Sequence, residues 1–161
     1  MAIMAVVAVV VLTKGGVTMA EYIYVDTQSV NAGQNVILND SIPCTKGYVT
    51  HRNGSGILTL RGIVNNPCAS FARYRVSFNA NIAVPTGGTV DPISVALAIN
   101  GEPLRSSLSI STPAAVEEFN NVTSTAFVTV PSGCCMTIAV ENTSGSEISV
   151  ANANLVIERT A

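Results

Sequence analysis

A strict alternation of apolar and polar residues runs through the middle of the chain. In the segment RYRVSFNANI, which covers residues 73–82, every second residue is apolar and the residues between are Arg, Ser or Asn. Successive side chains of a β-strand point to opposite faces, so a period of two produces one apolar and one polar face. No segment from Tyr22 onward sustains the spacing of three and four residues that an amphipathic helix needs. The segment is therefore predicted to be a core strand.

The same criterion predicts strands along the rest of the chain. They cover residues 22–25, 35–38, 56–61, 93–99, 103–110, 124–130, 134–140 and 147–158. The dipeptide Asn100-Gly101, between two alternating runs, predicts a tight hairpin. A short helical turn at residues 112–119 is a weaker alternative. Many short strands with regular turn signals are typical of an all-β sandwich, jelly roll or barrel.

Composition narrows the class of function. With 161 residues the chain fits one domain, and only 11% of its residues are charged, against a usual ~25%. The net charge is -2 and the eight Lys and Arg residues are scattered singly, which argues against a nucleic-acid partner. The chain has a single histidine, which excludes most mechanisms of histidine-dependent catalysis and most classes of zinc enzyme. We therefore expect no enzyme, no catalytic residue, no metal site and no cofactor.

The first 18 residues differ from the rest of the chain. Residues 1–12 are apolar, but a membrane span needs about 20 such residues, so no membrane span is predicted. A secretory signal would carry positive charge before the apolar run, whereas Lys14 follows it. The sequence KGGVTM can be encoded by a bacterial ribosome-binding site and a start codon at Met19. We expect residues 1–18 to lie outside the fold, as a mis-assigned start or a leader, and residues 19–161 to form one domain made in the bacterial cytoplasm.

The cysteines do not form a metal-binding or redox motif. Cys44, Cys68, Cys134 and Cys135 lack a C-x-x-C spacing. Buried free thiols are the leading interpretation, and disulfides formed after release from a reducing compartment remain open. Strand alternation predicts that Cys134 shares the apolar face of residues 136, 138 and 140 and is the least reactive, with Cys135 more accessible. In a reducing cytoplasm we expect all four thiols to stay free, which thiol counting on native and denatured protein would test.

Two predicted strands avoid charge on both faces. In residues 94–99 the second face carries Ser94, Ala96 and Ala98, and residues 148–157 carry apolar or amide side chains on both faces. A strand of this kind is buried on both faces. Either a loop of the same chain covers the second face, or a neighbouring subunit does.

Four segments together resemble a known family. They are ARYRVSFNANI from Ala72, VALAINGE from Val95, STAFVTVP from Ser124 and NANLVIER from Asn152. The region from Phe71 to Glu158 resembles the C1q/TNF-like jelly roll of bacterial and bacteriophage surface proteins. The resemblance implies an antiparallel jelly-roll sandwich that forms a homotrimer. It extends to the tips of spore-surface collagen-like proteins, but the Gly-x-y stalk is missing, so a stand-alone phage head-fibre or capsid-decoration protein is the better match.

The expected function follows from the resemblance and the composition. We expect a non-enzymatic structural protein on a phage virion surface, a homotrimer whose other partners are virion proteins such as the capsid. The trimer interface is predicted on the strands that carry Tyr74 and Leu155, on whichever faces are not in the core, and Ala153 is predicted to lie within it. The alternatives are a spore- or cell-surface protein and a carbohydrate- or receptor-binding module, with host-surface glycans as ligands. The candidate ligand-binding loops contain His51, Arg52, Asn53, Thr86 and Gly87.

Overall fold

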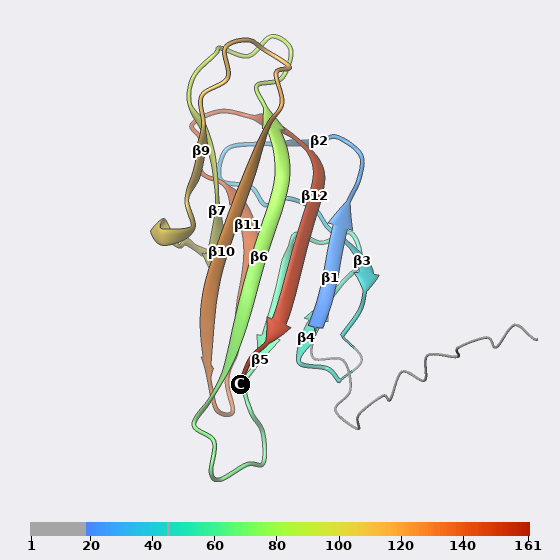
Figure 1. Ribbon diagram of the computed structural model, residues 1–161, viewed down its shortest axis with the longest axis vertical. Helices are drawn as coiled ribbons and strands as arrows, with labels where there is room; N and C mark the ends of the chain where they lie inside the picture. Colours follow the sequence, from blue (N-terminus) through green and yellow to red (C-terminus); the bar gives the residue numbers. More distant parts are fainter. Residues whose placement is uncertain (1–18, 45) are drawn as a thin grey trace, which may run out of the picture.

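The computed structural model describes residues 19–44 and 46–161, which form two facing antiparallel β-sheets (Figure 1). The front sheet has the strand order β10-β6-β12-β1-β3, with β2 paired to β12, and the back sheet has the order β4-β5-β11-β7-β8, with β9 paired to β7. The front strands are β1 (Met19–Tyr24), β2 (Gln28–Val30), β3 (Asn39–Ile42), β6 (Phe71–Ala83), β10 (Asn120–Pro131) and β12 (Ile148–Arg159). The back strands are β4 (Val49–His51), β5 (Ile57–Arg61), β7 (Ile93–Ile99), β8 (Glu102–Pro103), β9 (Ser109–Ser111) and β11 (Cys135–Asn142). The predictions for residues 1–18 fall outside the described residues.

The front sheet is built on its three longest strands. β6 pairs with β10 from Phe71 opposite Pro131 to Ile82 opposite Asn120, and on its other side it pairs with β12. The alternation predicted for residues 73–82 is confirmed, because apolar positions are buried and the polar positions between them face outward. Among the described residues no helix is long and apolar enough to cross a membrane.

The core between the sheets consists of apolar side chains from the strands of both layers. Tyr74, Val76, Phe78, Val95, Leu97, Val128, Ile138 and Val140 are buried there. Ile99 is only partly buried and packs against the core, because it is the last residue of β7. The predicted hairpin is also confirmed: Asn100 and Gly101 both have positive φ, at 51° and 81°, which matches the twist of the flanking strands.

Two segments that were predicted to be single strands do not form them. Residues 35–38 make only one isolated bridge, yet Val36 and Leu38 are fully buried. Their backbone connects the two layers instead of joining a ladder. The Val36 N–H donates to the Val140 carbonyl of the back sheet at 2.8 Å, while the Gln28 side chain of the front sheet bonds the N–H and C=O of Ile37 at 2.8 and 2.9 Å.

Residues 103–110 are not one strand but β8, the 3₁₀ turn η1 (Arg105–Ser107) and β9. A side chain breaks the ladder, since the Ser107 hydroxyl accepts the Leu97 N–H at 2.9 Å and donates to the Leu104 carbonyl at 2.7 Å. The helical alternative at residues 112–119 is also wrong. The Glu118 carboxylate accepts the N–H groups of Ala114 and Ala115 and closes a turn there.

A β-bulge changes which residues of β12 face the core. Asn152 has a φ of 53°, and the pairing with β6 shifts register between Ala151 and Asn154. The extra residue shifts the alternation by one position, so Val150 and then Ala153 point inward. Ala153 is 2% exposed and lies in the core of the subunit. The prediction that Ala153 lies in a subunit interface was therefore wrong.

The second face of β7 is covered within the chain itself. Ala96 and Ala98 are each 1% exposed in the single subunit. The β8–η1–β9 segment runs along the same strand edge, and Pro103 and Leu108 lie with Ala96 around one hollow. For this strand the loop explanation holds, and no partner subunit is needed.

The cysteines were predicted to be buried, but the structure does not bury them. Cys68, Cys134 and Cys135 are exposed and Cys44 is half-buried, and all four are free thiols. Cys134 precedes β11 and lies in the turn after β10, where its N–H donates to the Pro131 carbonyl at 3.1 Å. Strand alternation does not apply to a turn residue, so the predicted shielding of Cys134 was wrong.

Candidate functional site

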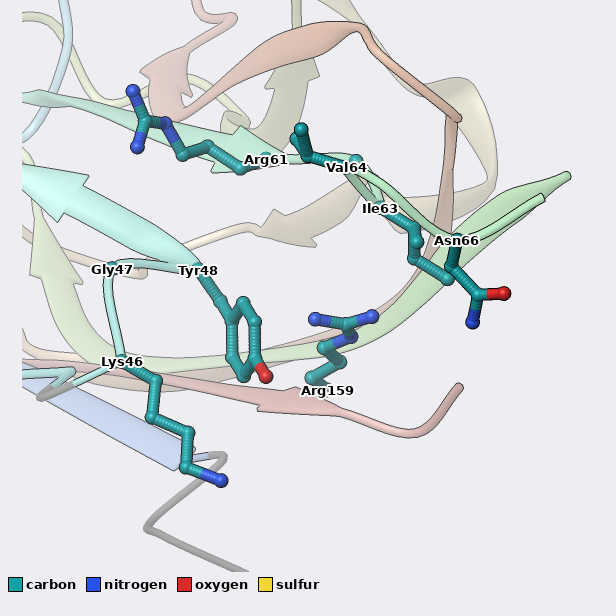
Figure 2. A pocket seen from close by; sticks show the side chains of 9 residues that line it. Lys46, Gly47, Tyr48, Arg61, Ile63, Val64, Asn66 and Arg159 are labelled. Carbon is teal, nitrogen blue, oxygen red and sulfur yellow. The ribbon is translucent and has the colours of Figure 1, made fainter. Parts of the chain in front are cut away.

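A pocket of about 400 Å³ opens at the end of the sandwich where β5 and β12 finish (Figure 2). It lies between the residues that lead into β4, the loop after β5 and the end of β12. Its lining is Lys46, Gly47, Tyr48, Arg61, Gly62, Ile63, Val64, Asn66 and Arg159. We call it the basic pocket, because three of the chain's eight Lys and Arg residues line it and no Asp or Glu of the described residues does.

Arg159 is the cation with the most defined position. Its guanidinium lies 4.0 Å from the centroid of the Tyr48 ring, a cation–π contact, and its Nε donates to the Ala161 carbonyl at 3.1 Å. Figure 2 shows Arg159 beside Tyr48 in the middle of the pocket, with Lys46 and Arg61 reaching outward on different sides. Within the described residues none of these three cations is paired with an Asp or Glu side chain, whereas Arg75 is paired with Glu158 at 2.8 Å.

The wall of the basic pocket is fixed by backbone contacts. The Gly62 N–H donates to the Cys134 carbonyl at 2.8 Å, and the Ile63 carbonyl accepts from the Gly133 N–H at 2.9 Å. A Cβ at position 62 would collide with the Pro131 carbonyl oxygen, so only glycine fits there. Behind the wall, the buried Tyr74 hydroxyl donates to the carbonyls of Arg61 and Tyr48. These contacts fix the shape of the basic pocket.

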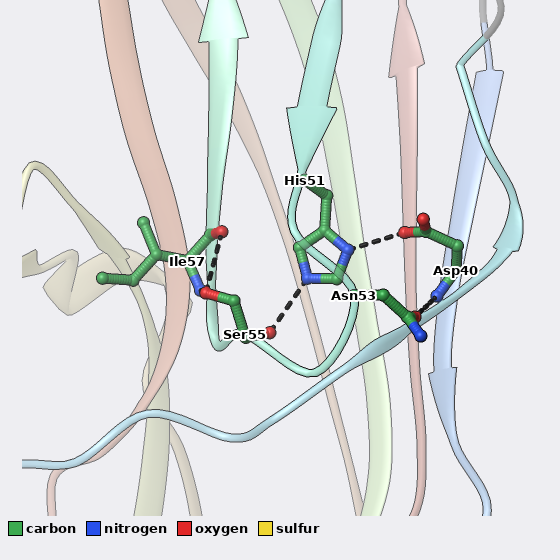
Figure 3. Close-up of polar contacts among 5 residues, drawn as sticks. All are labelled: Asp40, His51, Asn53, Ser55 and Ile57. Atoms are coloured by element: carbon green, nitrogen blue, oxygen red, sulfur yellow. Dashed lines mark hydrogen bonds and ion pairs between the residues drawn. The ribbon is translucent and has the colours of Figure 1, made fainter.

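His51 occupies a buried position at the end of β4 (Figure 3). Its side chain is 1% exposed, although the segment around it is rich in turn residues. Nδ1 lies 2.6 Å from Oδ1 of Asp40, Nε2 lies 2.9 Å from the Ser55 carbonyl, and the ring packs edge-on against Tyr22 with centroids 4.9 Å apart. A carboxylate and a carbonyl both accept hydrogen bonds, so the ring satisfies both when both of its nitrogens donate. His51 thus holds β3 against the β4–β5 turn.

Replacing His51 by Leu is expected to lower the free energy of unfolding by roughly 1–3 kcal/mol, since the Asp40 carboxylate and the Ser55 carbonyl lose the ring that contacts them. For a domain of this size each kcal/mol corresponds to about 2–4 °C in melting temperature. Thermal melting of the variant measures the loss. The matched control is Thr50→Leu at the exposed neighbour, which should melt within about 2 °C of the parent. Equal melting of the two variants would contradict this role.

The other predicted loop residues lie apart from one another. Arg52 and Asn53 are exposed in the turn after β4, and the Asn53 side chain accepts the Asp40 N–H at 2.9 Å. Thr86 and Gly87 are exposed in the loop between β6 and β7, at the top of the view in Figure 1, where Thr86 donates to Glu117 at 2.6 Å. The turn after β4 instead packs beside β3, so the structure does not bring the two predicted loops into one site. Among residues 19–44 and 46–161 no three His, Cys, Asp or Glu residues are grouped to hold a metal ion.

The outer face of the front sheet carries a continuous uncharged surface. It consists of Ser77, Asn79 and Asn81 on β6, Asn121, Thr123 and Thr125 on β10, and Ala151, Asn154 and Val156 on β12. We call it the amide face. Asn121 lies on the edge strand β10, opposite Asn81, and donates to the side-chain oxygens of Asn79 and Asn81 at 2.7 and 3.1 Å. These hydrogen bonds between neighbouring strands hold the amides in a fixed layer.

The amide face continues to an edge strand that also carries no charge. β10 forms one edge of the front sheet, and its twelve residues, NNVTSTAFVTVP, include no Asp, Glu, Lys or Arg. Phe127 points outward from it and is 62% exposed. Exposed edge strands are ordinarily protected by charges, bulges or internal prolines, because their free backbone groups can pair with other chains. On β10 the only proline is the last residue, which is typical of a surface covered in an assembly.

Comparison with known proteins identifies the architecture. No family model and no curated protein matches the chain in sequence. Among solved structures, Eiger TNF from S. frugiperda matches with a TM-score of 0.61 and 15% identity, over 89% of this chain and 94% of that one. The globular domain of zebrafish complement 1qA protein matches with a TM-score of 0.52 and 13% identity, over 86% of this chain and 94% of that one. The chain therefore has the C1q/TNF-like jelly-roll fold predicted from its strand segments.

Proposed function

We propose that this protein is a non-enzymatic structural subunit of a bacteriophage virion surface and that it assembles as a homotrimer through its amide face. The observation that carries the proposal is the uncharged surface over β6, β10 and β12, continued along the β10 edge. Residues 77–83, 120–126 and 148–157 of these strands contain no charged residue at all. Charged surface is usually spread over a soluble subunit, so its absence from one broad face favours burial there.

The energetics of the amide face suit an interface between identical subunits. Desolvating amides and hydroxyls that are already hydrogen-bonded to one another costs far less than desolvating charges. Phe127, which is largely exposed in the single subunit, supplies an apolar anchor beside the polar layer. A stable interface needs roughly 800 Å² per partner, an area that three long neighbouring strands can provide. The fold itself is compatible with this arrangement, because the resemblance to C1q/TNF-like domains implies a trimer.

The virion location rests on the resemblance to the jelly rolls of bacteriophage surface proteins. The described part holds no metal-binding group of His, Cys, Asp and Glu, and its one histidine is engaged with Asp40 and Ser55. In this proposal the trimer is attached to a capsid or tail protein. Mass spectrometry of purified virions should detect the protein, and antibodies against it should bind intact particles. Its absence from virions that carry its gene would contradict the location.

Assembly is tested by Thr125→Glu, which places a charge on the amide face where its edge strand β10 pairs with Ser77. Thr125 is exposed in the subunit, so the variant should remain folded, with circular dichroism unchanged. Light scattering should give a trimer for the parent and a monomer for the variant at micromolar concentration, because burying an unpaired charge costs several kcal/mol. The matched control is Thr50→Glu, an exposed threonine on β4 of the back sheet, which should stay trimeric. A stable monomer of the parent would refute the proposal.

A further inference from the structure

In the part of the chain that the structure describes, the basic pocket is lined by three cations that no Asp or Glu side chain pairs with. Tertiary structure gathers three cations there that are separated in sequence by 15 residues or more, in a chain whose net charge is -2. Lys46 and Arg61 make no side-chain hydrogen bond or ion pair within the described residues, and Arg159 bonds only the main-chain oxygen of Ala161, the last residue of the sequence. Cations placed around one pocket without Asp or Glu side chains beside them raise the local potential and attract anions.

The remaining lining sets the size and the nature of the anion. A volume of about 400 Å³ lies in the range of small-molecule sites and exceeds what an inorganic ion fills. Tyr48, Ile63 and Val64 add apolar surface, so the ligand needs a carbon body next to its charged group. The Asn66 side-chain oxygen already accepts the Cys68 N–H at 3.1 Å, which leaves the amide nitrogen as a donor.

We propose that the basic pocket binds a sugar acid: a saccharide ring that carries a carboxylate or a phosphate group. The guanidinium of Arg159 takes the oxyanion with two parallel N–H donors, and Lys46 and Arg61 add charge from the rims. The ring lies against Tyr48 and Ile63, and Asn66 donates to a ring hydroxyl. This site is separate from the predicted loops at His51–Asn53 and Thr86–Gly87. It does not depend on the proposed trimer, since all its lining comes from one subunit.

The ligand class is tested by titrating the full chain with four probes, using two-dimensional NMR or calorimetry. Glucuronic acid or glucose 6-phosphate should bind, and the tighter of the two identifies the oxyanion. Glucose and inorganic phosphate should bind at least tenfold more weakly than that acid, because each lacks one half of the recognised group. Binding should weaken as salt rises, since the pocket is open to solvent. Equal binding of glucose or of inorganic phosphate, or binding of neither acid, would overturn the proposal.

The location is tested by substitution. Arg159→Gln should weaken binding roughly tenfold or more, the effect of losing a charged hydrogen-bond donor, with Arg159→Lys in between. Because Arg159 also stacks on Tyr48, a second variant combines Lys46→Gln with Arg61→Gln, whose side chains make no hydrogen bonds in the described residues. It should melt as the parent does and still lose at least tenfold in affinity. The control is Arg52→Gln, which removes an exposed cation outside the pocket and should bind as the parent does. If Arg52→Gln lost binding while the pocket variants kept it, the site would lie elsewhere.

Discussion

Replacing Ala153 by Glu is expected to unfold the subunit rather than to separate subunits. Ala153 is 2% exposed and packs in the core between the sheets. A carboxylate there has no partner, and an uncompensated buried charge costs about 3–5 kcal/mol, before any cost of added volume. Domains of this size are stable by only about 5–15 kcal/mol, so the variant should lose a large part of its stability. Urea denaturation followed by circular dichroism measures the loss.

The matched control is Ala151→Glu, two residues earlier on the same strand. Ala151 is partly exposed on the amide face, opposite Asn81, so a carboxylate there remains hydrated in the single subunit. This variant should keep most of its unfolding free energy and, if the amide face is the interface, should be monomeric. An Ala151→Glu protein that unfolds while Ala153→Glu stays folded would show that the bulge at Asn152 is misplaced.

Raising the pH from 10 to 12 is expected to remove a substantial part of the stability. Burial raises the pKa of Tyr74 to about 12, and burial together with the negative charge of Asp40 raises the pKa of Tyr22 as well. The unfolded chain loses its phenolic protons near pH 10, while the folded chain retains them. The unfolded state therefore binds fewer protons in this range, and the free energy of unfolding falls as the pH rises. For Tyr74 alone, this raised pKa corresponds to about 2 kcal/mol lost between pH 10 and 12, and Tyr22 adds to the loss.

The measurement is the urea midpoint at pH 8, 10, 11 and 12. The double variant with Tyr22→Phe and Tyr74→Phe should start lower at pH 8, because the carbonyls of Tyr48 and Arg61 lose a donor. Its midpoint should then fall less steeply between pH 10 and 12. Tyr24→Phe, at a partly buried tyrosine, should keep the steep fall because both buried phenols remain. A parent protein with the same midpoint at pH 8 and 12 would contradict this account.

Much of the fold could be predicted because it depends on local rules. The period of two in residues 73–82 defines β6 and its buried face, since a strand can bury only one side of an amphipathic pattern. Asn100-Gly101 fixes the β7–β8 turn because both residues tolerate positive φ. These signals involve neighbours in the chain, and no distant residue is needed to interpret them.

Departures from regular strand geometry could not be predicted from the sequence. One residue in the left-handed region, Asn152, reverses the faces of the rest of β12 and moves Ala153 from an expected interface into the core. Ser107 replaces a backbone ladder with its hydroxyl, so a predicted strand becomes a 3₁₀ turn. Cys134 falls in a turn, where alternation has no meaning. In each case the pattern of residues is compatible with a strand, and packing against other segments decides otherwise.

The sequence by itself determined the fold class, the low charge and the scarcity of catalytic residue types. Only the tertiary structure decided where polar groups meet. His51 appears in a turn-rich segment, but Asp40 from β3 and the ring of Tyr22 from β1 enclose it. Lys46, Arg61 and Arg159 appear as scattered single charges, yet the ends of β5 and β12 bring them around one pocket. The physical reason is that strand formation depends on periodicity along the chain, whereas a site depends on contacts between strands that are distant in sequence.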